Sequence, residues 1–272
     1  MTNDVVVLGL GRMGRAMAAR YADAGWQVRS WSRSGGGTAP TARAATEGSG
    51  VIVLALFDDR ACDAVLDELG DAVAGRLVVN TSTISVDGAE AAARRVADRG
   101  GRYVHAPVLG SVPAVLNGTL RVLAGGTDAD LAEAEQVLEP LADDVRHVGT
   151  AGGAAAAKLV ANSSLAGAAL ALRDSLDGAA ALGLPLADAL DLLVLGRLGE
   201  LAASVRARLA DPGAAAYFTV AAIAKDVRLL ADASGPPGLA DRIAALVDDG
   251  DVQPDDDFTA LAVPTTYLAE VR

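Results

Sequence analysis

The sequence predicts a doubly wound α/β domain followed by an all-α domain, with one long helix joining the two. Strand-type and helix-type segments alternate up to residue 148, and no convincing strand follows Gly183. Residues 149–183 are rich in alanine and leucine and contain no proline, which favours a single helix of about 30 residues. We therefore expect residues 1–149 and 150–272 to form the two domains.

The elements of the first domain follow from its local sequence pattern. Short apolar runs, mostly β-branched, predict strands, and the segments between them predict helices. The expected strands are residues 4–8, 27–32, 51–57, 77–80, 102–104, 120–124 and 145–148. The expected helices are residues 15–24, 40–47, 84–99 and 128–142.

The second domain is expected to be helical throughout. Its predicted helices are residues 186–195, 199–209, 220–234 and 239–248. A last helix, 259–268, should be kinked or split by Pro264, which cannot continue a helical hydrogen-bond ladder.

The first strand leads into a glycine-rich turn and then a helix. Residues 9–14 have the G-x-G-x-x-G pattern in the strand–turn–helix context of a Rossmann-type dinucleotide-binding domain. The first glycine allows the tight turn, the second lets the backbone approach a pyrophosphate, and the third lets the helix pack on the strand. The helix N-terminus offers N–H groups to the phosphates. The expected cofactor-binding residues here are Gly9, Leu10, Gly11, Arg12, Met13 and Gly14.

The end of the second strand predicts which dinucleotide binds. NAD-binding domains usually place an acid there to take the ribose 2′-hydroxyl, but this strand ends Ser32-Arg33-Ser34 and no acid follows within reach. Arg33 can pair with a 2′-phosphate, and the serines can add hydrogen bonds. We therefore predict NADP(H) as the cofactor, with an ordinary surface arginine as the alternative interpretation of Arg33.

The composition excludes several classes of partner. The net charge of −12 would repel nucleic acid and an anionic membrane surface. A single cysteine, Cys62, excludes an internal disulfide and favours the reducing cytoplasm, and the N-terminal residues do not form a signal peptide. The uncharged run 159–172 is shorter than the roughly 20 residues of a membrane span. The two histidines, His105 and His147, have no metal-ligand pattern around them, so no metal is expected.

Lys158 and Asn162 interrupt the apolar surface of the long helix. They are four residues apart, so they lie one turn apart on the same face. A desolvated lysine beside an amide is costly, which indicates a functional pair. The alternative is a lysine that reaches solvent from the first turns, with Asn162 in a helix–helix hydrogen bond.

Five segments, taken in order, carry a family resemblance. They are GLGRMGRAMA at 9–18, NTST at 80–83, HAPVLGSVPAVLNGTL at 105–120, GTAGGAAAAKLVAN at 149–162 and KDV at 225–227. In this order and spacing they resemble the motifs of the β-hydroxyacid dehydrogenases, which include 3-hydroxyisobutyrate dehydrogenase and tartronate semialdehyde reductase. The resemblance runs nearly the whole length of the chain.

The resemblance implies roles for particular residues. Lys158 falls on the family's catalytic lysine and Asn162 on its supporting asparagine. Cofactor contacts are expected from Leu56 and Phe57 at the end of the third strand, and the resemblance adds Thr83 and Lys225. The implied substrate-binding residues are Leu109, Gly110 and Ser111.

Three departures from the family's pattern affect these roles. The segment after Arg33 is about a dozen residues shorter than in the family, which affects the adenosine edge. The substrate loop has His105, Leu109 and Ser111 where the family has Asp, Ser and Gly, and Ala154 replaces a glycine before Lys158. Leu109 cannot supply the hydroxyl that grips a substrate carboxylate, so a less polar substrate is an alternative.

The expected reaction is hydride transfer between nicotinamide and a small hydroxy acid or semialdehyde, or a related carbonyl. Lys158 would donate a proton to the carbonyl oxygen in reduction and accept one in oxidation. Burial and the nearby cation Lys225 are expected to lower the pKa of Lys158. Asn162 would orient the substrate or the lysine.

Two other functions remain open at this point. The imine reductases and reductive aminases are similar to this chain in fold and opening motifs, although they generally have Asp or Tyr where Lys158 stands. A nucleotide-binding module without turnover is the second alternative. We also expect a cytoplasmic homodimer, paired through the helical domain, because so apolar a helix needs a second copy to cover it.

Overall fold

The computed structural model describes residues 3–236 and 238–267. The chain divides into two compact units, Met1–Leu159 and Val160–Arg272. The division falls inside the long helix α7 (Ala151–Ala181), because its first turns bury Ala151 and Ala155 in a core of the first unit. The boundary expected at 149/150 remains a prediction about the functional domains.

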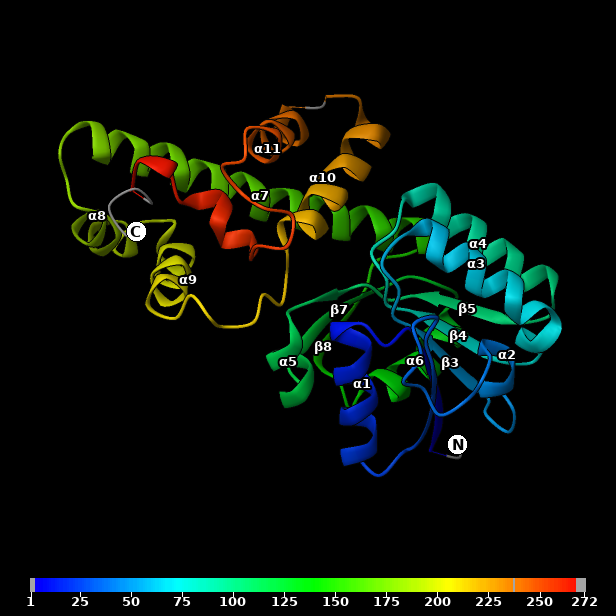
Figure 1. Cartoon of the computed structure of the whole chain (residues 1–272). Coiled ribbons are helices and arrows are strands. Elements are labelled where there is room, and N and C mark those ends of the chain that lie inside the picture. The colour runs from blue at the N-terminus through cyan, green and yellow to red at the C-terminus, as the bar shows by residue number, and fades with distance from the viewer. Residues whose placement is uncertain (1–2, 237, 268–272) are drawn as a thin grey trace. The chain divides into compact units, whose positions relative to one another are not determined.

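A five-stranded parallel sheet forms the centre of the first unit (Figure 1). The strand order is β2-β1-β3-β4-β5, so the chain runs to one edge of the sheet and then returns past β1 to the other. This reversal between β1 and β3 confirms the doubly wound prediction and creates a crevice at the carboxyl ends of these two strands. The strands are β1 (Asp4–Leu8), β2 (Gln27–Trp31), β3 (Val51–Leu54), β4 (Leu77–Asn80) and β5 (Arg102–His105).

Helices cover both faces of this sheet because its strands are apolar on both sides. On β1, Val5 and Val7 pack in one core cluster, with α1 and α6, while Val6 and Leu8 pack in the other, with α2, α3 and α4. Figure 1 shows α3 and α4 side by side over their face. The helices are α1 (Arg12–Asp23), α2 (Ala42–Ala45), α3 (Asp59–Leu69), α4 (Val86–Asp98) and α6 (Asp128–Leu138), and a 3₁₀ turn, η1 (Gly70–Val73), follows α3.

A second sheet of three strands completes the first unit. Its strands are β6 (Val108–Leu109), β7 (Leu120–Ala124) and β8 (Ala142–His147), with the short helix α5 (Val112–Asn117) between β6 and β7. β7 pairs antiparallel with β6 and parallel with β8. The sequence did not predict β6 or α5, because a two-residue strand and a six-residue helix carry too little periodicity to stand out from a loop.

Several element boundaries differ from the predicted ones. α1 begins at Arg12 rather than residue 15, because Gly14 is accommodated inside the helix. β3 ends at Leu54 rather than residue 57, since its ladder ends where both neighbouring strands end. The helix predicted over 128–142 ends at Leu138 and strand β8 begins at Ala142. Pro140 contributes to this, because a proline has no N–H with which to continue the helical hydrogen-bond ladder.

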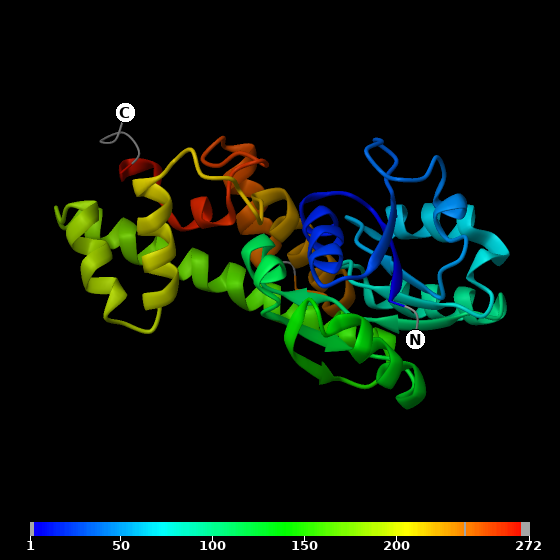
Figure 2. The ribbon, with the colours of Figure 1, turned by 90° about the horizontal axis from the view of Figure 1, so that it is seen from below.

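The second unit is helical, as predicted (Figure 2, green to red). The rest of α7 packs in one apolar core with residues from every later helix. The helix predicted over 259–268 is a short 3₁₀ turn followed by Pro264, after which a new helical segment begins at Thr265, and residue 268 lies outside the described residues. The elements are α8 (Leu186–Val194), α9 (Gly199–Ala210), α10 (Val220–Ser234), α11 (Gly238–Asp248) and η2 (Phe258–Ala262).

α7 is the one helix of the described residues that is long and apolar enough to cross a membrane by length and composition. The expectation that its uncharged run is too short for a span was too strict, because isolated charges leave the mean hydropathy of the longer stretch high. The side chains of Lys158, Asn162 and Arg173 are nevertheless buried on this helix. Buried polar side chains of this kind are typical of a helix that packs against other parts of a protein.

Arg173 provides a test of how the second unit is held together. Its guanidinium donates to the backbone oxygen of Val263 at 2.9 Å and to Asp251 Oδ2 at 2.5 Å, and it is buried. Arg173→Met should lower the free energy of unfolding by about 1–3 kcal/mol, because both acceptors lose their donor. Arg242→Gln, which removes an exposed ion pair with Asp174, should cost less than about 1 kcal/mol. Urea denaturation that gave both variants the wild-type midpoint would contradict this role of Arg173.

Candidate functional site

The glycine turn after β1 is built from very close backbone contacts. Gly9 has a φ of +100°, and an ideal Cβ there would lie 2.3 Å from the backbone oxygen of Ala55. A Cβ at Gly14 would lie 1.8 Å from the backbone oxygen of Gly9. No side chain fits at either position, so the pattern is required by the packing of α1 on β1.

Gly11 differs from the other two glycines because a Cβ there would meet nothing within 4 Å. It is the N-cap of α1, and no side chain caps the helix at this end. The first N–H groups of a helix lack intrahelical acceptors and carry a partial positive charge. Open space above an uncapped helix N-terminus fits the pyrophosphate of a dinucleotide. Of the neighbouring predicted contacts, Arg12 is exposed, while Met13 packs against the core.

The segment after β2 carries the predicted determinants of the dinucleotide type. The hydroxyl oxygens of Ser32 and Ser34 are 3.1 Å apart, and Arg33 between them is exposed. Within the described residues, the Arg33 guanidinium has no carboxylate or carbonyl partner. From Arg33 to Val51 the chain forms only the four-residue helix α2, as expected for a shortened adenosine edge.

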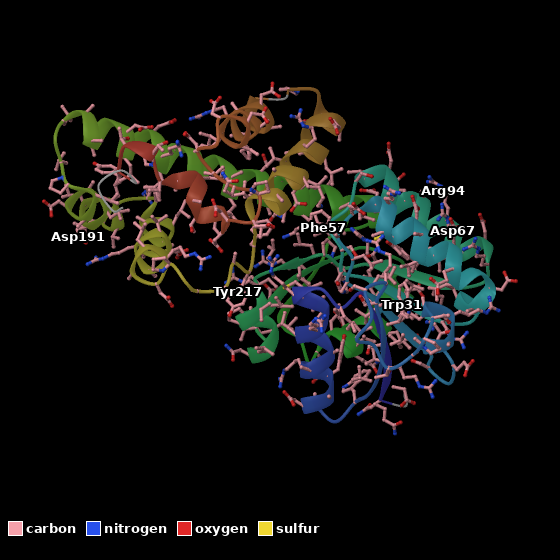
Figure 3. The ribbon with its side chains drawn as sticks, viewed as in Figure 1. Trp31, Phe57, Asp67, Arg94, Asp191 and Tyr217 are labelled. Carbon is pink, nitrogen blue, oxygen red and sulfur yellow. The ribbon has the colours of Figure 1, made fainter. Side chains whose placement is uncertain are left out.

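The loops after β3 and β4 are joined by a chain of hydrogen bonds. The backbone N–H of Leu56 donates to Ser82 Oγ at 2.9 Å, and the N–H of Ser82 donates to Asn80 Oδ1 at 3.0 Å. Phe57 follows Leu56 and is exposed (Figure 3), and Thr83 follows Ser82. Since all these loops leave the carboxyl ends of parallel strands, they line the same edge of the sheet as the glycine turn.

The predicted substrate loop is more ordered than expected. Leu109 lies in β6 and pairs with Arg121 of β7. Gly110 has a φ of +123°, and a Cβ there would lie 2.9 Å from the Leu120 side chain. Ser111 is the N-cap residue of α5 but makes no side-chain cap hydrogen bond. The loop therefore presents one aliphatic side chain followed by one hydroxyl.

A buried polar group lies beneath this loop, and the sequence did not predict it. His105 has no exposed surface, and its Nδ1 is 3.3 Å from the hydroxyl of Tyr103, which accepts a hydrogen bond from Asn80 Nδ2 at 3.0 Å. Burial lowers the pKa of His105 to about 3, so the imidazole is neutral at physiological pH. Because it is covered, His105 offers no exposed surface for contact with a substrate. The signal for this cluster was the pairing of Asn80 with His105 on adjacent strands.

The second unit contains a compact cluster around Asp226. This carboxylate is buried, with 2 % of the residue exposed. It accepts a hydrogen bond from Asn162 Nδ2 at 2.5 Å and an ion-pair contact from Lys225 Nζ at 2.5 Å. The structure thus brings together two predicted site residues through a third that the sequence analysis named only as part of a motif.

Lys158 lies one helical turn before Asn162 on α7, and its residue is 8 % exposed. The two residues stand on either side of the division between the units, within one continuous helix. Asp226 accepts only, so it fixes the orientation of the Asn162 amide, whose Nδ2 donates to it. This arrangement places a buried lysine and an oriented amide one turn apart on the same helix, a combination suited to moving a proton at a carbonyl group.

Comparison with known proteins supports this assembly. Residues 4–149 match the family model of the NAD-binding domain of 6-phosphogluconate dehydrogenase. A probable 3-hydroxyisobutyrate dehydrogenase of Mycobacterium bovis is 31 % identical over 205 residues, which cover 70 % of this chain and 68 % of that protein.

Solved structures show the same architecture. The Mycobacterium tuberculosis 3-hydroxyisobutyrate dehydrogenase, determined with L-serine, is 27 % identical with a TM-score of 0.84 over 96 % of this chain and 98 % of that one. An imine reductase of Streptomyces aurantiacus is also 27 % identical, with a TM-score of 0.60 over 95 % and 98 % of the two chains. With the glycine turn and the five motifs in place, the chain belongs to the β-hydroxyacid dehydrogenase family of NAD(P)-dependent oxidoreductases.

Proposed function

We propose that the chain is an NADP-dependent oxidoreductase that interconverts a small hydroxy acid with its semialdehyde, or a related alcohol with its carbonyl, using Lys158 as general acid–base. The observation that carries the proposal is the placement of Lys158, buried on α7 one turn before an asparagine that a carboxylate holds in one orientation. A structural lysine has no need of such an oriented neighbour. The functional domains are proposed as residues 1–149 and 150–272.

In this proposal the residues of the chain bind the cofactor, orient the substrate and move one proton. When bound, the cofactor supplies or takes up the hydride. Lys158 donates a proton to the substrate oxygen as negative charge develops there in reduction, and accepts it in oxidation. Asn162 orients the reacting group, and Lys225, Thr83, Leu56 and Phe57 are proposed cofactor contacts.

NADP is proposed over NAD because Arg33 and two serine hydroxyls occupy the position where NAD-binding domains place an acid. The turn at Gly9, Gly11 and Gly14, with Leu10, Arg12 and Met13, is the proposed pyrophosphate site.

Imine reduction is the second candidate, and Leu109 is the observation that favours it. An aliphatic side chain stands where the family supplies a hydroxyl to a substrate carboxylate, so a substrate held by Leu109, Gly110 and Ser111 would be expected to carry a less polar group there. The lysine at 158 favours the first candidate, because the imine reductases generally have Asp or Tyr at this position.

The function is tested by NADPH consumption with a panel of small aldehyde- and keto-acids, apolar aldehydes and cyclic imines. We expect turnover of the acids, and Lys158→Ala should lower kcat by about 10²–10⁴ while the Kd for NADPH is unchanged. Arg94→Ala, an exposed residue of α4, is the control that should retain kcat. Full turnover by Lys158→Ala would exclude the lysine as acid–base, and turnover of imines alone would favour the second candidate.

The cofactor preference is tested by titrating the protein with NADPH and NADH. Loss of one charge-assisted contact, worth about 1.5–3 kcal/mol, corresponds to a 10- to 150-fold change in affinity. Arg33→Gln should therefore weaken NADPH binding by at least about tenfold and leave NADH binding near the wild-type value. Equal Kd values for the two cofactors in the wild-type protein would contradict an NADP preference.

We also propose a cytoplasmic homodimer that pairs through the helical unit and binds neither nucleic acid nor a membrane. Large apolar side chains are exposed at one end of this unit, with Leu182 82 %, Leu192 61 % and Leu195 85 % exposed. Large exposed apolar side chains that gather on one surface are typical of protein interfaces, and we propose that these leucines form one.

Sedimentation at micromolar concentration should therefore give the dimer mass, and Leu195→Glu should shift the protein toward the monomer, because a charge would be buried in the interface. A monomer mass for the wild-type protein would refute the pairing.

A further inference from the structure

Three arginines at or beside the two predicted cofactor-binding segments, 9–14 and 32–34, are left without a counter-charge. Arg12, Arg15 and Arg33 have no carboxylate or carbonyl partner within residues 3–236 and 238–267. Some other arginines of the first unit are engaged: Arg20 donates to the backbone oxygen of Pro140 at 2.8 Å, and Arg99 to that of Leu66 at 2.7 Å. In a chain with 35 acidic residues and a net charge of −12, a group of unpaired guanidiniums marks a place for an anion.

Arg15 differs from Arg12 in what lies beside it. Arg12 is the first residue of α1, next to the open space above Gly11. Arg15 is three residues further along the helix, and its guanidinium lies against the loop that follows β2. An ideal Cβ at Gly36 would be 3.7 Å from Nη1 of Arg15 and 4.0 Å from its Nη2.

The loop after β2 is shaped so that Gly36, three residues after Arg33, lies beside the Arg15 guanidinium. Gly35 and Gly36 have φ values of +85° and +82°, which turn the chain back sharply after Arg33. The part of the loop that runs back is held against β2, because the N–H of Thr38 donates to the backbone oxygen of Ser30 at 2.9 Å. Trp31, labelled in Figure 3, begins this loop at the end of β2.

The loop also carries two hydroxyl groups on the residues next to Arg33. Ser32 and Ser34 flank Arg33, and their hydroxyl oxygens are 3.1 Å apart. Two cations and two hydroxyls around one short turn match the needs of a phosphate monoester, which carries close to two negative charges and three acceptor oxygens. A single arginine neutralises only part of that charge.

We propose that Arg15 is a second specificity-determining residue for NADP, and that its guanidinium and that of Arg33 hold the 2′-phosphate together from opposite sides of the turn 32–36. The inference rests on the proposed NADP preference. It assigns Arg15 to the 2′-phosphate rather than the pyrophosphate, because Arg15 lies at Gly36 whereas the pyrophosphate space lies at Gly11.

The test is a calorimetric titration of the full chain with NADPH, NADH and adenosine 2′-phosphate. Arg15→Gln should weaken NADPH and adenosine 2′-phosphate by about tenfold and leave NADH unchanged, because only the first two carry the 2′-phosphate. Arg12→Gln should weaken NADPH and NADH by the same factor. Arg94→Gln, which removes an exposed arginine paired with Glu90 on α4 (Figure 3), should change none of the three.

The outcomes separate this inference from the function on which it rests. If the wild-type protein prefers NADPH and Arg15→Gln keeps the same preference, the proposed role of Arg15 is wrong and the proposed cofactor is retained. If Arg15→Gln weakens NADPH and NADH equally, the residue serves the pyrophosphate and the inference is wrong. If the wild-type protein binds NADPH and NADH equally, both the NADP preference and the role of Arg15 fail.

Discussion

The first unit depends on one close backbone approach, that of α1 to the end of β1. With a Cβ at Gly14 only 1.8 Å from the backbone oxygen of Gly9, no other residue permits this packing. The approach fixes where α1 begins, and therefore where its uncapped N-terminus and Arg12 lie relative to the sheet. Every loop of the proposed cofactor site borders that point, because the strand order reverses between β1 and β3. A two-glycine constraint thus sets the geometry of a much larger site.

Buried polar groups hold the loops beside this point. Asn80 lies at the end of β4, accepts from the N–H of Ser82 and donates to the Tyr103 hydroxyl, so one amide joins two strand ends. His105 extends the cluster as a neutral ring, since burial lowers its pKa to about 3. An unpaired carboxylate in the same covered position would cost far more to bury. A histidine can therefore be buried here because its imidazole is neutral.

How far the sequence predicts this structure depends on whether a feature is local. The turn at Gly9, the long helix α7 and the order of strands and helices follow from glycine spacing, propensity and periodicity. The end of α6 also has a local signal, Pro140. The apolar residues that follow Pro140 made the helix look longer in the sequence than it is. By contrast, β6 and α5 exist because β7 offers a partner strand, and Asp226 becomes significant only when α10 packs beside Asn162. Contacts between distant segments leave no short-range pattern to detect.

Asp226 also changes the electrostatic argument for the helical unit. Lys225 was expected to act as a nearby cation, but its Nζ lies 2.5 Å from the Asp226 carboxylate, so its charge is offset within the same cluster. A paired lysine acts at a distance as a dipole, whose field falls off faster than that of a single charge. The carboxylate meanwhile holds the Asn162 amide by its donor end. The influence of this cluster is therefore chiefly geometric: it fixes the orientation of the Asn162 amide, one helical turn from Lys158 on α7.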